Sequence, residues 1–503
     1  MPRSSHTQND PHEPLGPELW EKVAKLTLSV SALLLIGYFL SRGGNFAQSK
    51  QTPAVLVDSR ASAQLSQRFC GVAEPSGRAV PIEMVYSEDK REWIEYAAAR
   101  FAKLCPNIQV KLRAMEDFSA LAAMLDGELH PTIWAPTDEL SLRYFQYQAE
   151  RQKRADGWQI IRRQELVRSP QVLLIWQDRL DVLSSVLREQ PSEEGTWVRS
   201  MCAGIPRNPA PGSLPREQMV PGRWLELAEP LLMTPAAGAV RRGQSPRVRP
   251  VGSDFLPEAA EIEKWGQVKI GHAIPTRFVA GLSAVFLLSY DYVLQPADRE
   301  ALAPSQPLAS PDQVAAQTDR LTRAYATRFS DEKDSLRRWL KRCEAGLESE
   351  VRPVKELTEG LFAAGPSRYD AVVTYENLTM RFLDKLDATA GSLKKLVVVY
   401  PNPTLVAHHP AVQFAAAPAQ SNAADKWLSF LLSTEMQHKA IEWGFRPGNP
   451  KVSIREYGVE QNRFLRLRRF GILPEPVFHE APRPDGRLLA ELIELWGEAT
   501  GRN

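Results

Sequence analysis

Apolar residues along the chain form short runs typical of buried strands and longer runs spaced as in amphipathic helices. From residue 82 onward the order is strand, helix, strand, helix, strand, which is the pattern of an α/β unit with a parallel sheet. The predicted strands span 82–86, 108–112 and 131–134, and the predicted helices span 90–104 and 118–125. Pro136 is expected to open the next helix, because proline is tolerated in a first helical turn.

The second half of the chain continues the pattern. A longer apolar strand is predicted at 165–176, interrupted by Ser169 and Pro170, and further strands are predicted at 268–272, 370–375, 395–400 and 411–415. Helices are predicted at 224–232, 281–293, 336–347, 354–362, 423–442 and 488–496. Residues 206–256, rich in Pro, Gly and Arg, are expected to form a loop-rich insertion, and 296–312 a linker. The predicted fold class is therefore α/β.

One segment has the length of a membrane span. Residues 26–41 carry no charge, and counting from residue 23 the stretch covers about 28 Å as a helix, close to the bilayer core. Acidic residues precede it and no good cleavage site follows, which favours an uncleaved signal anchor over the alternative, a cleaved signal peptide. We expect a cytoplasmic tail at 1–22, a transmembrane anchor at 23–41, a linker at 42–80 and an extracytoplasmic bulk.

Charge and cysteine usage narrow the function classes. The 503 residues include 62 Lys and Arg against 60 Asp and Glu, so the net charge of +2 gives no support for a nucleic-acid binder. The basic run at 241–249 is interpreted as a solvated loop. None of the four cysteines lies in a CxxC pair, which argues against a zinc site. An exported chain could form two disulfides, with Cys70 and Cys105 as the first candidate pair, and buried free thiols are the alternative.

Sequence motifs of enzymes are absent: there is no GxGxxG, GxxxxGK, HExxH or GxSxG. Two acidic pairs, at 88–89 and 138–139, are interpreted as solvated acids at helix starts. What recurs is an apolar strand followed by a polar turn before a helix. In open α/β sheets, ligands bind beyond the carboxyl ends of strands, where helix N-termini offer free N–H groups. Such turns on two facing lobes would form a ligand cleft, and no metal or cofactor is expected.

Seven segments carry a resemblance to a known family. They are IEMVYSEDKREWIEYAAARFAKLCPNIQV, HPTIWAPTDEL, ELVRSPQVLLIW, WGQVKIGHAIPTRFVAGLSAVFLLSYDY, DAVVTYENL, KLVVVYPNPTLVAHHPAVQF and WLSFLLSTEMQHKAIEWGFRPGNP. In this order, across residues 81–450, they resemble bacterial extracellular solute-binding proteins of the type 2 periplasmic-binding-protein fold. The branch in question is often fused to a von Willebrand factor A domain, which this chain lacks, so an A-type domain would have to come from a partner chain.

The resemblance implies two α/β lobes that close on a solute by a hinge motion. Lobe I would comprise 81–170 and 396–455, lobe II 171–395, and a C-terminal tail 456–503, with crossing strands near 166–176 and 395–401. By the family pattern, the ligand-facing positions are Ser87, Thr137, Asp138, Pro275, Tyr375 and Glu376. The implied function is solute binding for a transporter, without catalysis. An interaction or sensor protein with a degenerate cleft is the alternative.

Departures from the family pattern bear on the ligand. The usual hydroxyl-rich loop is Gly271-His272-Ala273-Ile274-Pro275 here, without its polar side chains. The usual serine-rich turn carries Asp138, and an acid at a helix start competes with an anion for the same N–H groups. Phosphate, sulfate and molybdate are therefore disfavoured, and a cationic or neutral organic solute fits better. Arg277 is the one candidate counter-charge for an anion.

Overall fold

The computed structural model describes residues 69–70, 79–189, 202, 222–233, 257–303, 310–387 and 396–502. The chain divides into two compact units, Met1–Leu65 and Ser66–Asn503, and the described helices and strands all belong to the second. The predicted tail, anchor and most of the linker lie outside the described residues, as does most of the 206–256 insertion. Within the described residues, no helix combines the length and apolar character that a membrane crossing needs.

Lobe I is built on a five-stranded sheet of order β2-β1-β3-β11-β4. Its first three strands are parallel and β11 is antiparallel to both its neighbours. The strands are β1 (Val80–Tyr86), β2 (Ile108–Ala114), β3 (Ile133–Ala135), β4 (Ile160–Glu165) and β11 (Pro410–Phe414). Its helices are α3 (Arg91–Leu104), α4 (Asp117–Leu125), α5 (Glu139–Arg151), α15 (Pro418–Leu431) and α16 (Thr434–Glu442). The predicted α/β unit is thus confirmed.

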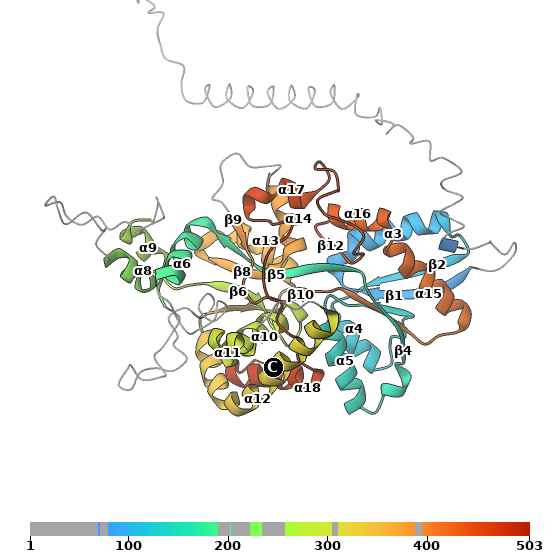
Figure 1. The fold of residues 1–503 in the computed structure, drawn as a ribbon, viewed down its shortest axis with the longest axis horizontal. Helices are drawn as coiled ribbons and strands as arrows, with labels where there is room; N and C mark the ends of the chain where they lie inside the picture. The colour runs from blue at the N-terminus through green and yellow to red at the C-terminus, as the bar shows by residue number, and fades with distance from the viewer. Residues whose placement is uncertain are drawn as a thin grey trace, which may run out of the picture. The chain divides into compact units, whose positions relative to one another are not determined.

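Lobe II holds a seven-stranded sheet in which β10, β5, β8, β6 and β7 follow one another, while β9 and β12 also pair with β5. The strands are β5 (Val167–Trp176), β6 (Ile270–Ala273), β7 (Glu348–Glu350), β8 (Ala371–Tyr375), β9 (Leu396–Val399), β10 (Val406–Ala407) and β12 (Arg446–Pro447). The helices that follow in the chain are α6 (Gln177–Glu189), α8 (Trp224–Met233), α9 (Ala259–Trp265), α10 (Val279–Val293), α11 (Pro296–Leu302), α12 (Pro311–Glu344), α13 (Val354–Ala364) and α14 (Glu376–Asp387). Figure 1 shows β5 running between the two lobes.

The apolar stripe of α3 shows how sequence pattern becomes packing. Trp93, Ala97, Phe101 and Leu104 recur at helical spacing and are all buried. The ring of Phe101 lies 5.2 Å from that of Trp427 on α15, edge to face. Aromatic pairs of this geometry contribute about 1 kcal/mol beyond burial. The stripe thereby fixes α3 and α15 against each other beside β1.

Several element boundaries differ from the sequence predictions, each for a local reason. The helix after β3 does not open at Pro136; Asp138 is its N-cap and accepts a hydrogen bond from Leu140 N at 2.8 Å. The helix predicted at 423–442 is two helices, because Ser433 caps the start of α16. The strand predicted at 165–176 breaks at Leu166 into β4 and β5, and Pro170 lies inside β5.

The longest helix extends well beyond its predicted range. Helix α12 begins at Pro311 behind a capping box of Ser310 and Gln313, whereas the apolar pattern predicted a start at 336. The first turns are exposed on nearly every side, so they carry no apolar period to detect. Part of the stretch predicted as a linker, 296–312, is also helical, as α11.

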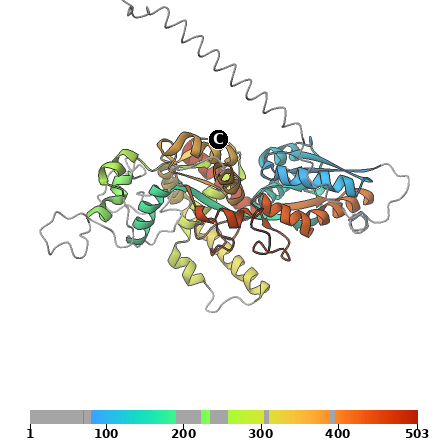
Figure 2. The ribbon, with the colours of Figure 1, turned by 90° about the horizontal axis from the view of Figure 1, so that it is seen from above.

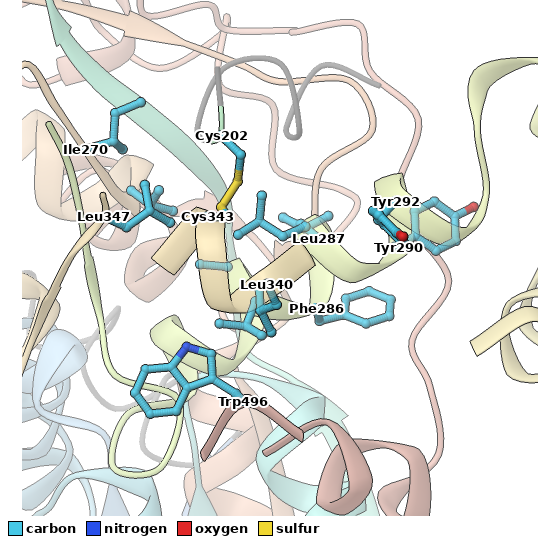
Figure 3. Packing of buried hydrophobic residues seen from close by; sticks show 14 of the residues in the cluster. Cys202, Ile270, Phe286, Leu287, Tyr290, Tyr292, Leu340, Cys343, Leu347 and Trp496 are labelled. Atoms are coloured by element: carbon cyan, nitrogen blue, oxygen red, sulfur yellow. A yellow bond between two sulfur atoms is a disulfide. The ribbon is translucent and has the colours of Figure 1, made fainter. Parts of the chain in front are cut away.

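The main hydrophobic core lies in lobe II, where α10 is buried along its whole length. Figure 3 shows Leu287 and Leu340 near the Cys202–Cys343 disulfide, with Phe286 and Trp496 farther away in the same core. Trp496 belongs to the C-terminal helix α18 (Gly486–Thr500) and is fully buried. Residues that were predicted to form a tail therefore complete this core.

Two disulfides and a buried ion pair hold the peripheral segments. Cys70 pairs with Cys105, as predicted, and Cys202 pairs with Cys343. On the far side of lobe II, the fully buried Asp370 accepts hydrogen bonds from Arg179 Nε at 3.0 Å and from Trp224 Nε1 at 2.9 Å. Because Trp224 starts α8, which lies within the inserted segment, this carboxylate ties that helix to the core, and the second disulfide ties down Cys202 just ahead of the insertion.

Candidate functional site

A cavity of ≈ 300 Å³ lies between the two lobes. From lobe I it is lined by the turns that follow β1, β2 and β3, and from lobe II by the starts of α10 and α13 and the end of β8. These are carboxyl ends of strands and N-termini of helices, the positions where α/β sheets bind ligands. The lining residues are Ser87, Glu88, Asp89, Glu116, Thr137, Phe278, Val279, Ala280, Pro353, Val354, Lys355, Glu356, Glu359, Tyr375 and Leu378.

Three of the seven residues predicted from sequence line this cavity: Ser87 and Thr137 from lobe I, and Tyr375 from lobe II. The other four do not. Pro275 is buried, and Arg277 is exposed to solvent. The remaining two, Asp138 and Glu376, are buried acids that already have counter-charges.

The partners of these two acids come from the C-terminal part of the chain. Asp138 caps α5 and lies 3.4 Å from the guanidinium of Arg483. Glu376 receives two hydrogen bonds from Arg446, at 2.6 and 2.7 Å. Asp138 does lie at a helix start, as predicted. It is only 1% exposed, however, so the prediction that it is solvated is wrong.

A fully buried lysine, which no local sequence pattern reveals, supports the lobe I wall. The ammonium of Lys90 donates to Ser87 Oγ, to Pro136 O at 3.0 Å and to His409 Nδ1 at 3.2 Å. Burial lowers the pKa of Lys90, and the neighbouring Asp89 opposes that shift. Burial also lowers the pKa of His409 to about 3, which keeps its ring neutral. Lys90 thereby joins the turns after β1 and β3 to the start of β11.

Two neighbouring acids after β2 have pKa values above those of surface carboxyl groups. Asp117 is buried, accepts hydrogen bonds from Thr137 N at 2.9 Å and Ser141 Oγ at 2.7 Å, and its pKa is raised to about 7, mainly by burial. The pKa of Glu116 is raised to about 8, first by burial and then by Asp117, Asp89 and Glu88. Both acids therefore hold protons more tightly than an ordinary carboxyl group does.

The lobe II wall offers an unsatisfied hydroxyl. Tyr375 is 2% exposed, and its hydroxyl has no hydrogen-bond partner among the described residues. Burial, followed by the negative charge of Asp138, raises the pKa of Tyr375 well above its ordinary value, so it stays protonated. A buried hydroxyl without a partner costs about 1–3 kcal/mol, which a ligand that hydrogen-bonds to it would recover.

The C-terminal region bridges the two lobes on one side of the cleft. Helix α18 packs against α12 and α10 of lobe II and against α5 of lobe I, and Figure 1 shows it between them. Ahead of it, residues 478–484, here called the strap, run beside the connection from β9 to β11. Thr404 N donates to His479 O at 3.0 Å, and Ala481 N donates to Thr404 O at 2.8 Å. The lobes are thus linked by α18 and the strap as well as by β5 and the connection from β9 to β11.

A larger cavity, of ≈ 980 Å³, lies away from the cleft, between the α11–α12 hairpin and the strap. Figure 2 shows this hairpin projecting from the rest of lobe II. Its lining is mainly apolar, and its arginines Arg143, Arg299 and Arg483 are all engaged with protein acceptors. No unpartnered buried polar atom of the described residues belongs to this lining. We therefore take the smaller cavity as the candidate site, because its lining includes a buried hydroxyl, that of Tyr375, which makes no hydrogen bond of ordinary length.

Comparison with known proteins gives similarities in structure only. No family model and no curated protein matches the chain. Similar solved structures include apo FutA2 from Synechocystis PCC6803, at 13% identity over 85% of this chain and 100% of that one, with a TM-score of 0.43. The sulfate-binding protein SubI from Mycobacterium tuberculosis H37Rv matches at 12% identity over 80% and 93%, with a TM-score of 0.38. Maltose-bound T. maritima MalE3 matches at 13% identity over 84% and 96%, with a TM-score of 0.40.

Proposed function

We propose that the chain is a membrane-anchored, extracytoplasmic solute-binding protein that holds a small solute between its two lobes and catalyses no reaction. The observation that carries the proposal is the interlobe cavity, to which both lobes contribute strand-end turns and helix starts. Its volume, ≈ 300 Å³, corresponds to the lower end of small-molecule sites, about 300 Å³ upward. Ser87, Thr137 and Tyr375 are the proposed polar contacts.

The extracytoplasmic location rests on two observations. Both disulfides are of the kind that persists in oxidising compartments. The segment at 23–41, which is uncharged from residue 26 onward, has the length to hold the folded unit to a membrane. A transporter that receives the solute, or a von Willebrand factor A-type chain, would be the partner.

A second candidate function is a sensor or interaction protein on the same scaffold. The strap and α18 favour it, because extra links between the lobes restrict the hinge motion that delivers solute to a transporter. In this case solute binding would change how the α11–α12 hairpin or the strap is presented, with little closure of the cleft.

Native mass spectrometry of the full-length protein, extracted in mild detergent without dialysis, tests the proposal. We expect a small-molecule adduct that is lost on denaturation. A protein that carries no adduct, and that no compound in a broad metabolite panel stabilises against heat, would refute solute binding and favour the interaction protein.

A further inference from the structure

The lobe I side of the cavity carries an excess of carboxylates. Glu88, Asp89 and Glu116, here called the acid wall, line it, and Asp117 lies beside Glu116 in the sequence. Two members of the wall have counter-charges: Glu88 lies 3.1 Å from Arg91, and Asp89 lies 3.7 Å from Lys90. Glu116 has no ion pair or hydrogen bond among the described side chains. Its carboxyl group is thus the member of the wall that is left for a ligand to pair with.

The lobe II side of the cavity is largely apolar. Among the described side-chain atoms of this wall, the buried hydroxyl of Tyr375 makes no hydrogen bond of ordinary length, and the Ser283 side chain is a polar neighbour that lowers its pKa. This is an observation independent of the acid wall, and it also calls for a hydrogen-bonding ligand. A tyrosine ring can in addition attract a cation to its face. The apolar residues around it are Phe278, Val279, Ala280, Pro353, Val354 and Leu378.

The charged side chains that line the cavity are mostly acidic. Five carboxylates, those of the acid wall together with Glu356 and Glu359, face the cavity against one ammonium, that of Lys355. Three of these residues, Lys355, Glu356 and Glu359 on α13, are exposed at the rim, where water screens their charges. Asp89 and Glu116 of the acid wall are less exposed, so their field acts more strongly on whatever enters the cavity.

We propose that the solute is a small organic cation, with an ammonium or guanidinium group against Glu116 and the Tyr375 hydroxyl and a short apolar body against Phe278, Val279 and Ala280. This inference rests on the proposed function and names its solute class. The charged group removes the repulsion among the acids and supplies a donor to the orphaned hydroxyl. The apolar body is what separates the solute from an inorganic cation, because the carboxylates that lobe II adds to the lining, those of Glu356 and Glu359, are exposed at the rim.

Protonation of Glu116 gives the site a pH signature. The charged and titratable groups that act on it or share the cavity lining are Glu88, Asp89 and Asp117 in lobe I, and Lys355, Glu356, Glu359 and Tyr375 in lobe II. Its pKa of about 8 in the empty cavity means that a cation binds by displacing a proton at neutral pH. Affinity for the cation should therefore rise up to about tenfold for each unit of pH below 8, and level off above it.

Three probes with four carbons each differ mainly in charge: n-butylammonium, n-butanol and n-butyrate. Each is titrated at millimolar concentration into the full-length protein, after the co-purified solute has been removed, with calorimetry and thermal shift as readouts. We expect n-butylammonium alone to bind, with proton release at pH 7. Equal or tighter binding of n-butyrate or n-butanol, or no binding of n-butylammonium, overturns the inference.

Variants tie the binding to the site. Glu116→Gln should weaken n-butylammonium binding about tenfold or more and abolish its pH dependence, and Tyr375→Phe should weaken it less. Glu128→Gln, an exposed acid just beyond α4, is the matched control and should bind as the wild type does. Unchanged affinity in Glu116→Gln contradicts the inference. A co-purified solute that is anionic or neutral would refute the cation while leaving the proposed function intact, whereas the lack of any solute would refute both.

Discussion

The link between the strap and lobe I can be tested at one buried ion pair. Arg483 is 9% exposed and donates to Glu480 at 2.7 Å and to Val406 O, and its guanidinium lies 3.4 Å from Asp138. Arg483→Gln leaves the carboxylate of Asp138 buried without a cation. Breaking a buried pair in this way costs about 3–5 kcal/mol. We expect about 3 kcal/mol, because Asp138 keeps its N-cap bond from Leu140 N.

A double-mutant cycle isolates the pair. The double variant Asp138→Asn with Arg483→Gln removes both charges of the pair, so it should be destabilised by about 2 kcal/mol less than the sum of the single variants. The exposed pair of Arg487 and Glu491 on α18 is the matched control, for which the coupling should be at most about 1 kcal/mol. Free energies come from urea unfolding followed by tryptophan fluorescence.

Hydrogen exchange adds a local readout to the cycle. Arg483→Gln should speed exchange in the strap and at the start of α5, while α8 and α9, on the other side of lobe II, keep wild-type rates. Additive single-variant effects, or a coupling no larger than that of Arg487 and Glu491, would show that the strap does not hold lobe I.

Three further predictions address stability. Glu376→Gln should cost about 3 kcal/mol in urea unfolding by leaving Arg446 without its counter-charge, while Glu475→Gln, in an exposed pair, should cost almost nothing. Since folding raises the pKa of Glu116 to about 8, the free energy of unfolding of the ligand-free protein should fall as pH rises from about 4.5 to 8 and then level off. Glu116→Gln should make this fall with pH less steep, and an unchanged pH dependence would contradict the raised pKa of Glu116. Replacing Cys202 and Cys343 by serine, a separation of 141 residues, should cost about 5 kcal/mol, against about 4 for Cys70 and Cys105, separated by 35; a reversed ranking in unfolding experiments would contradict the loop-entropy argument.

Local pattern predicted much of the fold. The stripe on α3 and the apolar runs of β1, β2, β8 and β9 lie within a residue or two of where the sequence placed them. Burial of one face enforces the period of α3 and β9, and burial of every residue makes β8 a continuous apolar run. The exposed start of α12 has no such period, so only its capping box could have revealed it. The role of α18 in the core depends on contacts far away in the chain, which periodicity does not encode.

The candidate site was predicted in part for the same reason. Ser87, Thr137 and Tyr375 follow directly from the rule that strand ends meet at a cleft, and they line it. Asp138 and Glu376 obey the same rule, but Arg483 and Arg446, more than 300 and about 70 residues away, pair with them. Lys90 looked like one more helix-start residue, since its burial depends on His409 from the other half of the chain. Pairings over such separations leave no local signal.

Solute binding between the lobes can be located by hydrogen exchange of the full-length protein, with and without the solute that native mass spectrometry identifies. Binding in the cleft predicts protection at the turns after β1, β2 and β3 and at the start of α10, with little change in the first half of α12. Protection confined to α12, α11 and the strap would place the solute in the larger cavity and contradict binding in the cleft.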